Sequence, residues 1–157
     1  MSSVVFPFVS YHVKTPAALL ALLVLAGCAT PVPDFPAPAA NWESLTGQLQ
    51  YVNPTRSIIG EFTAARHGSD FRLEFSKGGA MTLLKLARHG DLILAEGPLA
   101  RGRWQGRAEA APAYLRGWVA VPAGFDRLRP NSRGAGPKSL TLPGAQAGEK
   151  FTFQFNR

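Results

Sequence analysis

The sequence predicts a mainly β domain with one or two helices. Glycine and proline are abundant, with 16 and 13 residues among 157, while charged residues make up only 17%. Hydrophobic residues reach 46%, which is enough for a packed core and excludes a wholly disordered chain. This mixture favours strands joined by turns over a helical bundle. The alternation of apolar and charged residues over residues 71–75 indicates a half-exposed strand.

Residues 1–27 are predicted to be a signal peptide, and removing them leaves 130 residues, the size of one domain. An uncharged run extends from Ala17 to Gly27. As a helix these residues would cover about 16 Å, because the rise is about 1.5 Å per residue. That length is too short to span a bilayer, whereas it suits the core of a secretory signal.

The run ends in Leu25-Ala26-Gly27-Cys28, which resembles the lipobox of bacterial lipoproteins. The resemblance implies cleavage before Cys28 and a covalent diacylglyceryl lipid on its thiol. Ala29, rather than Asp, follows the cysteine, which implies a lipid-anchored protein of the outer membrane that faces the periplasm. The alternative is a free or buried cysteine after an ordinary signal peptide. With one cysteine, the chain can form neither an internal disulfide nor a multi-cysteine metal site.

Residues 28–40 are predicted to be the lipidated cysteine and a proline-rich tether. Four prolines lie between Ala29 and Ala40, so an extended conformation with a reach of roughly 35 Å is expected. The alternative is a leader without a role. A single domain is then expected over residues 41–157.

Turn residues divide this domain into strands. One short motif occurs twice, as Ala65-Arg66-His67-Gly68 and as Ala87-Arg88-His89-Gly90, each time between two strands. We expect the same turn to be used twice, because glycine tolerates a positive φ angle. The expected strands are 46–53, 56–65, 71–75, 81–87 and 92–95, followed by a final hairpin of 138–142 and 149–156.

One helix is expected over residues 110–121. Pro112 suits a first helical turn, and Tyr114, Leu115 and Trp118 fall on one apolar face. Pro122 and Gly124 are expected to end this helix. A single helix covers only part of one sheet face, yet Ile58-Ile59, Leu83-Leu84 and Leu92-Ile93-Leu94 place apolar side chains on both faces. The second face is therefore expected to close on itself, meet a partner or hold an apolar ligand.

The order of elements resembles the LolB family of outer-membrane lipoproteins, which receive other lipoproteins from a periplasmic carrier and insert them into the membrane. The resemblance covers roughly residues 42–122 and is a pattern of elements, not a catalytic signature. It departs from the family in length, since the chain is short after the helix. The residues that carry it are Trp42–Leu49, Asp70–Phe75 and Tyr114–Pro122.

The resemblance implies a curved antiparallel sheet, an incomplete barrel, with a helical lid over an apolar cavity. It also implies a membrane-contacting loop, which corresponds here to residues 76–81, with Ala80 and Met81 as the membrane-loop candidates. The loop has no leucine at its tip, so insertion activity is not implied. The side chains predicted to line the cavity are Phe62, Phe71, Leu73, Phe75, Leu83 and Leu92.

No catalytic motif occurs in the sequence, and we expect no enzyme and no cofactor other than the lipid on Cys28. His67, Ser69 and Asp70 are residue types of a catalytic triad, but neighbours in one turn cannot adopt its geometry. His67 and His89 could share a sheet edge and bind a metal. Two ligands are weak evidence, so two exposed turn histidines and no metal site are expected.

The basic residues leave the choice of partner open. The formal net charge is +7, and arginines surround Trp104. Anionic headgroups are a better partner than nucleic acid for a lipidated periplasmic protein, and a solvated basic face is the alternative. Two functions follow for an expected monomer. The first is a carrier of acyl chains or lipoprotein cargo, and the second is a structural or assembly lipoprotein that docks a protein or an anionic envelope partner.

Overall fold

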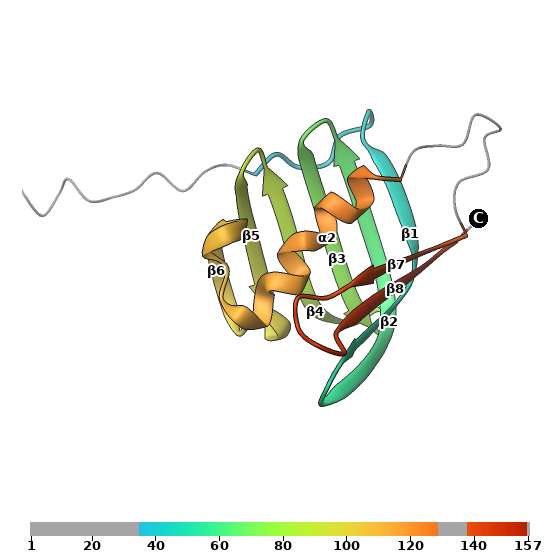
Figure 1. The fold of residues 1–157 in the computed structure, drawn as a ribbon. Helices are drawn as coiled ribbons and strands as arrows, with labels where there is room; N and C mark the ends of the chain where they lie inside the picture. Colours follow the sequence, from blue (N-terminus) through green and yellow to red (C-terminus); the bar gives the residue numbers. More distant parts are fainter. Residues whose placement is uncertain (1–34, 129–137, 157) are drawn as a thin grey trace, which may run out of the picture. The chain divides into compact units, whose positions relative to one another are not determined.

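The computed structural model describes residues 35–128 and 138–156. Within them, an open antiparallel sheet of eight strands is curved around one helix (Figure 1), in the order β6-β5-β4-β3-β2-β1-β8-β7. The sheet does not close into a barrel, which confirms the predicted mainly β class with an incomplete barrel and a helical lid. The strands are β1 (Glu43–Asn53), β2 (Arg56–His67), β3 (Asp70–Lys77), β4 (Met81–His89), β5 (Leu92–Gly97), β6 (Gly102–Arg107), β7 (Ser139–Pro143) and β8 (Lys150–Phe155).

The two copies of the Ala-Arg-His-Gly motif form equivalent turns, as predicted. Gly68 and Gly90 have φ angles of 58° and 56°, a region that L side chains rarely adopt. The register places the β2–β3 and β4–β5 turns at one end of the sheet, which we call the His67 end. The opposite end, formed by the β1–β2 turn, the β3–β4 turn, the β5–β6 connection and the β7–β8 loop, is called the Arg56 end.

Helix α2 (Arg116–Asp126) lies across one face of the sheet (Figure 1). The predicted helix over residues 110–121 was therefore wrong at both ends. Residues Ala108–Ala110 and Ala113–Leu115 form short 3₁₀ turns, η3 and η4, before α2. Pro122 and Gly124 lie inside α2, where both are buried. Packing of the helix against the sheet outweighs the loss of one helical hydrogen bond at Pro122.

Strand β6 was missed by the sequence reasoning. Its residues, Gly-Arg-Trp-Gln-Gly-Arg, contain one large apolar side chain, so no alternation of apolar residues marks them as a strand. They pair with β5 along its whole length, from Leu92–Arg107 to Gly97–Gly102. A 3₁₀ turn, η2 (Pro98–Ala100), connects the two strands.

An aromatic core fills the space between α2 and the sheet. Trp118 packs against Tyr51 and Phe151 with ring centroids 4.8 and 4.7 Å apart, and Phe125 packs 4.9 Å from Phe153. All of these side chains are at most 4% exposed. The core residues all belong to one compact unit, which begins at Phe35.

Candidate functional site

Five of the six predicted cavity residues are buried in this core. Phe62, Phe71, Leu73, Phe75 and Leu83 are between 0 and 8% exposed. Phe71 packs 5.2 Å from Phe125 and Phe75 packs 5.8 Å from Trp118, measured between ring centroids. Leu83 lies where a β-bulge shifts the register between β3 and β4. These residues contribute to the packed interface with the helix.

Leu92 does not join the other five, which corrects its assignment to the interior. It pairs with His89 and alternates with the buried Ile93, so it lies on the outer face of the sheet, away from α2. The sequence run Leu92-Ile93-Leu94 is apolar at every position, and only the register shows which of its residues face the core.

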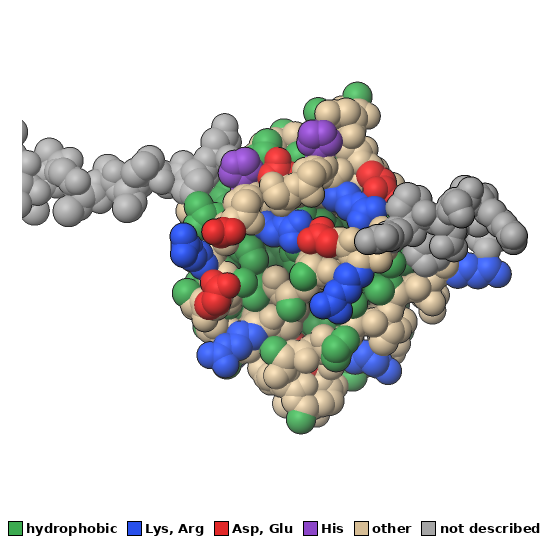
Figure 2. Space-filling view, turned by 45° about the horizontal axis from the view of Figure 1, so that its top comes forward, with side chains coloured by type: hydrophobic (Ala, Val, Ile, Leu, Met, Phe, Trp, Pro, Cys, Tyr) green, Lys and Arg blue, Asp and Glu red, His purple; other side chains and the backbone are tan. Residues whose placement is uncertain are grey.

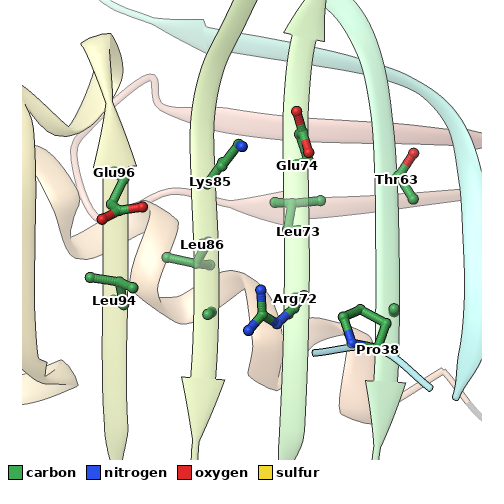
Figure 3. Close-up of a pocket in the computed structure, with 11 residues that line it drawn as sticks. Pro38, Thr63, Arg72, Leu73, Glu74, Lys85, Leu86, Leu94 and Glu96 are labelled. Carbon is green, nitrogen blue, oxygen red and sulfur yellow. The ribbon is translucent and has the colours of Figure 1, made fainter. Parts of the chain in front are cut away.

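The outer face carries a shallow groove of about 330 Å³ (Figure 3). Glu74 of β3 and Lys85 of β4 are cross-strand partners beside it, and Leu94 of β5 forms part of its apolar lining. Pro38 lies at the β2 side of the groove, with Arg72 reaching out from β3 (Figure 3). The N-terminal segment of the described chain therefore runs over this face.

Arg72 fixes that segment to the sheet. Its guanidinium donates hydrogen bonds to the carbonyl oxygens of Pro36, at 2.8 Å, and of Phe35. The Phe35 side chain is only 8% exposed. Residues 35–38, which were predicted to belong to the tether, thus pack on the domain. Residues 1–34, with Cys28, lie outside the described residues.

The two turn histidines lie at the His67 end, each with its own partner. The Nδ1 atom of His89 is 2.7 Å from an Asp70 carboxylate oxygen, and the Nε2 atom of His67 is 3.2 Å from the Asn41 side-chain nitrogen. Figure 2 shows both histidine side chains on one part of the surface. Among the described residues, no group of three or more His, Cys, Asp or Glu side chains could hold a metal ion.

The membrane-loop candidates lie at the Arg56 end. Met81 is 59% exposed and pairs with Lys77 beside the β3–β4 turn, which contains Ala80. Ile59, at 57% exposed, adjoins Gly60, and Gly60 lies against the carbonyl oxygen of Ser76 near the end of β3. Ile59 and Met81 thus flank the end of β3 from opposite faces of the sheet. Ile59 shares the outer face with Thr63, whereas Met81 pairs with Lys77 on the face that carries α2. Sequence reasoning found Met81 but did not single out Ile59 as exposed, because that required the register of β2.

The same end is rich in cations. Arg56 begins β2, Lys77 ends β3, Arg101 follows η2, and Lys150 begins β8. All four side chains belong to exposed residues. The opposite, His67 end carries the carboxylates of Glu43, Asp70, Asp91 and Asp126. The His67 end also carries Arg66, Arg88 and Arg107, and three of its carboxylates are paired with a basic side chain. Its charges are therefore mixed, whereas the four exposed side chains named at the Arg56 end are all cationic.

A cleft of about 450 Å³ opens at the Arg56 end, with mostly polar walls. Asn53, Thr55 and Arg56 of the β1–β2 turn form one side, and Arg101 lies on another. The remaining lining residues come from the last part of β1, from η2, from η4 and the first turn of α2, and from the β7–β8 loop. They are Tyr51, Pro98, Leu99, Tyr114, Trp118 and Gln146.

A buried polar network lies behind this cleft. Tyr51 donates a hydrogen bond to Glu149 at 3.1 Å and accepts one from the Asn53 side-chain amide at 3.2 Å. Burial is the largest cause that raises the pKa of Tyr51, and the Glu149 charge raises it further. The Tyr51 hydroxyl therefore stays protonated and keeps donating to Glu149.

Comparisons with known proteins do not assign the chain to a family. No protein-family model matches the chain. No curated protein matches its sequence. Among the described residues, none of the helices is both long and apolar enough to cross a membrane. A function is therefore inferred from the sequence signals and from the geometry of the domain.

Proposed function

We propose that this chain is a lipid-anchored lipoprotein of the outer membrane, on its periplasmic side, whose domain docks on the anionic bilayer surface through the Arg56 end. The observation that carries the proposal is the combination of two exposed apolar side chains, Ile59 and Met81, with cations on the neighbouring turns. Removing an apolar side chain completely from water is worth roughly 1.5–3 kcal/mol, which is the upper bound for its entry into the bilayer. Each cation near an anionic surface adds about 1 kcal/mol.

The packed core favours docking over the carrier function. An acyl chain that entered between α2 and the sheet would have to separate Phe75 from Trp118 and Phe71 from Phe125. Protein cores are packed as densely as organic crystals, so such a separation is costly. The proposed function therefore follows the second of the two functions that the sequence allows, with the membrane itself as the partner.

The attachment by Arg72 is compatible with this orientation. Seven residue steps separate Cys28 from Phe35, which allows at most about 25 Å of extended chain. Five residue steps along β3 separate Arg72 from Lys77, or about 17 Å. A lipid on Cys28 can therefore reach a membrane that lies against the Arg56 end.

Vesicle binding by the chain from residue 29 onward, which lacks the lipid, tests the proposal. This chain contains the whole compact unit that begins at Phe35. We expect it to sediment with vesicles that contain phosphatidylglycerol and to bind neutral phosphatidylcholine vesicles less. Met81→Glu should weaken binding to the anionic vesicles, because it removes an apolar contact and adds a repelled charge.

Ser69→Glu is the matched control, since it adds the same charge at the His67 end. Equal vesicle binding by Met81→Glu and Ser69→Glu would contradict the proposed orientation. Saturable binding of a fluorescent fatty acid by the wild-type chain, lost in Leu73→Glu under conditions where this variant stays folded, would instead establish the carrier function.

A further inference from the structure

We propose that the cleft at the Arg56 end is a binding site for a phosphate-type oxyanion, held by the guanidinium groups of Arg56 and Arg101. Both arginines line the cleft, and they come from different connections of the sheet. Within the described part of the chain, neither forms an ion pair with a carboxylate. Two planar groups with fixed donors are suited to a tetrahedral oxyanion.

The backbone of Arg101 supports a specific role for its side chain. Its φ and ψ angles are 56° and 40°, which makes it the only described non-glycine residue with a positive φ. Glycine would adopt this conformation without steric cost, and the neighbouring residues with a positive φ, Gly97 and Gly102, are both glycines. An unfavourable conformation that is kept at a cleft is a recognised sign of a functional side chain.

Neighbouring groups hold Arg101 in place. Its backbone N–H donates to the carbonyl oxygen of Pro98 at 3.1 Å. Its guanidinium carbon lies 4.3 Å from the centroid of the Tyr114 ring, in a cation–π contact. The Tyr114 hydroxyl lies 3.4 Å from the carbonyl oxygen of Ala100, to which it donates. The side chain is thus positioned before any ligand arrives, which lowers the entropic cost of binding.

The buried carboxylate of Glu149, behind the cleft, does not neutralise both Arg56 and Arg101. Glu149 accepts hydrogen bonds from the Tyr51 hydroxyl and from the backbone N–H groups of Ala145 and Gln146, at 2.8 and 3.2 Å. The hydrogen-bond donors to the Glu149 carboxylate are therefore all uncharged groups. Two guanidinium groups against one carboxylate leave the cleft with a net positive charge, as an anion site requires.

The ligand has two possible sources, a lipid headgroup or a free phosphate. The site itself does not depend on the proposed membrane contact, whereas a headgroup as its source rests on that proposed function. A volume of about 450 Å³ accommodates a phosphate with a small substituent. The shared chemistry, a phosphate-type oxyanion, is what the cleft recognises.

The test is an NMR titration of the ¹⁵N-labelled chain from residue 29 onward with inorganic phosphate, against sodium chloride at matched ionic strength. We expect saturable shifts of the Arg56 and Arg101 side-chain N–H signals and of the backbone signals of residues 98–102. Arg101→Gly keeps the backbone conformation and removes the guanidinium, so phosphate binding should weaken about tenfold or more. Arg107→Ala, at the other end of β6, should leave phosphate binding unchanged.

Vesicles of phosphatidylglycerol distinguish the sources. Cleft signals that respond to these vesicles and depend on Arg101 identify the headgroup, and a response to inorganic phosphate alone identifies the free anion. If neither response differs between the wild type and Arg101→Gly, the site is refuted. If Met81→Glu abolishes vesicle binding but keeps the phosphate shifts, the two proposals are separated. If the wild type binds phosphate but not vesicles, the membrane proposal alone fails.

Discussion

Arg66 and Arg88, the second residues of the repeated motif, fasten the end of helix α2. Arg66 donates to the carbonyl oxygens of Phe125 and Leu128 at 2.6 and 3.0 Å. Arg88 forms two hydrogen bonds with the Asp126 carboxylate, at 2.7 and 3.0 Å. The last carbonyl groups of a helix lack partners within it and carry partial negative charge, so cations stabilise them. The repeat thus supplies both turns and helix caps.

Arg66→Ala should lower the free energy of unfolding by about 1–3 kcal/mol, because two carbonyl groups lose a charged donor. Urea unfolding followed by circular dichroism measures this change. Arg107→Ala, an exposed arginine on β6, serves as the control and should stay within about 0.5 kcal/mol of the wild type. A loss as small as that of the control would show that Arg66 does not stabilise the helix end.

The raised pKa of Tyr51 predicts that the folded protein loses stability at high pH. Its pKa is raised in the folded protein, mainly by burial, above the ordinary value near 10. Above that pH the unfolded chain loses the hydroxyl proton while the folded chain keeps it, so this group destabilises the fold as the pH rises. Below about pH 9 both states are protonated and the effect is absent.

The variant Tyr51→Phe isolates this contribution. At neutral pH it should be less stable than the wild type, because the Asn53 and Glu149 side chains lose their partner. Between pH 9 and 11 the stability difference should shrink, since only the wild type has the tyrosine that opposes folding when the unfolded chain ionises. Thermal unfolding of both proteins over this range gives the comparison; a constant difference would refute the assigned pKa direction.

At the scale of elements, α2 is held mainly by its aromatic side chains. Trp118 contacts Tyr51, Phe75 and Phe151 and is 1% exposed. The helix contains Pro122 and two glycines, all unfavourable in a helix interior. Its stability therefore comes from packing on the sheet, not from the intrinsic preferences of its residues.

Trp118→Ala should cost roughly 3–5 kcal/mol of unfolding free energy, the usual range for a large buried aromatic side chain. Chemical denaturation is the measurement. Trp104→Ala, which removes a half-buried tryptophan of β6, should cost less. A loss below about 0.5 kcal/mol for Trp118→Ala would mean that the helix is not docked through this face.

At the scale of the whole molecule, the proposed docking at the Arg56 end depends on the proposed lipid anchor at Cys28, which would keep the domain at a membrane. If Cys28 is the lipidated residue, Cys28→Ala should prevent both acylation and lipoprotein-type cleavage. Mass spectrometry of the protein from cell envelopes should then show the lipid mass in the wild type and its absence in the variant. An unmodified thiol on the wild-type protein would end the lipoprotein interpretation.

The strand pattern could be predicted closely from the sequence, because glycine-containing turns and alternating apolar residues act over short distances. Strands β1 to β5 and the β7–β8 hairpin lie within a few residues of the predicted ranges. The positive φ angles of Gly68 and Gly90 likewise follow from a local preference. Met81 was suggested only by the loop that the resemblance to the LolB family implies, and its side chain is exposed.

Tertiary structure alone decided the features that depend on distant contacts. Pairing with β5 makes β6 a strand, and packing on the sheet continues α2 through Pro122. The register places Leu92 outside and Phe71 inside. Arg56 and Arg101 are 45 positions apart in the sequence, and the open sheet brings both to the same cleft. Sequence patterns report preferences over a few neighbouring residues, whereas such a cleft exists only once the strands have paired.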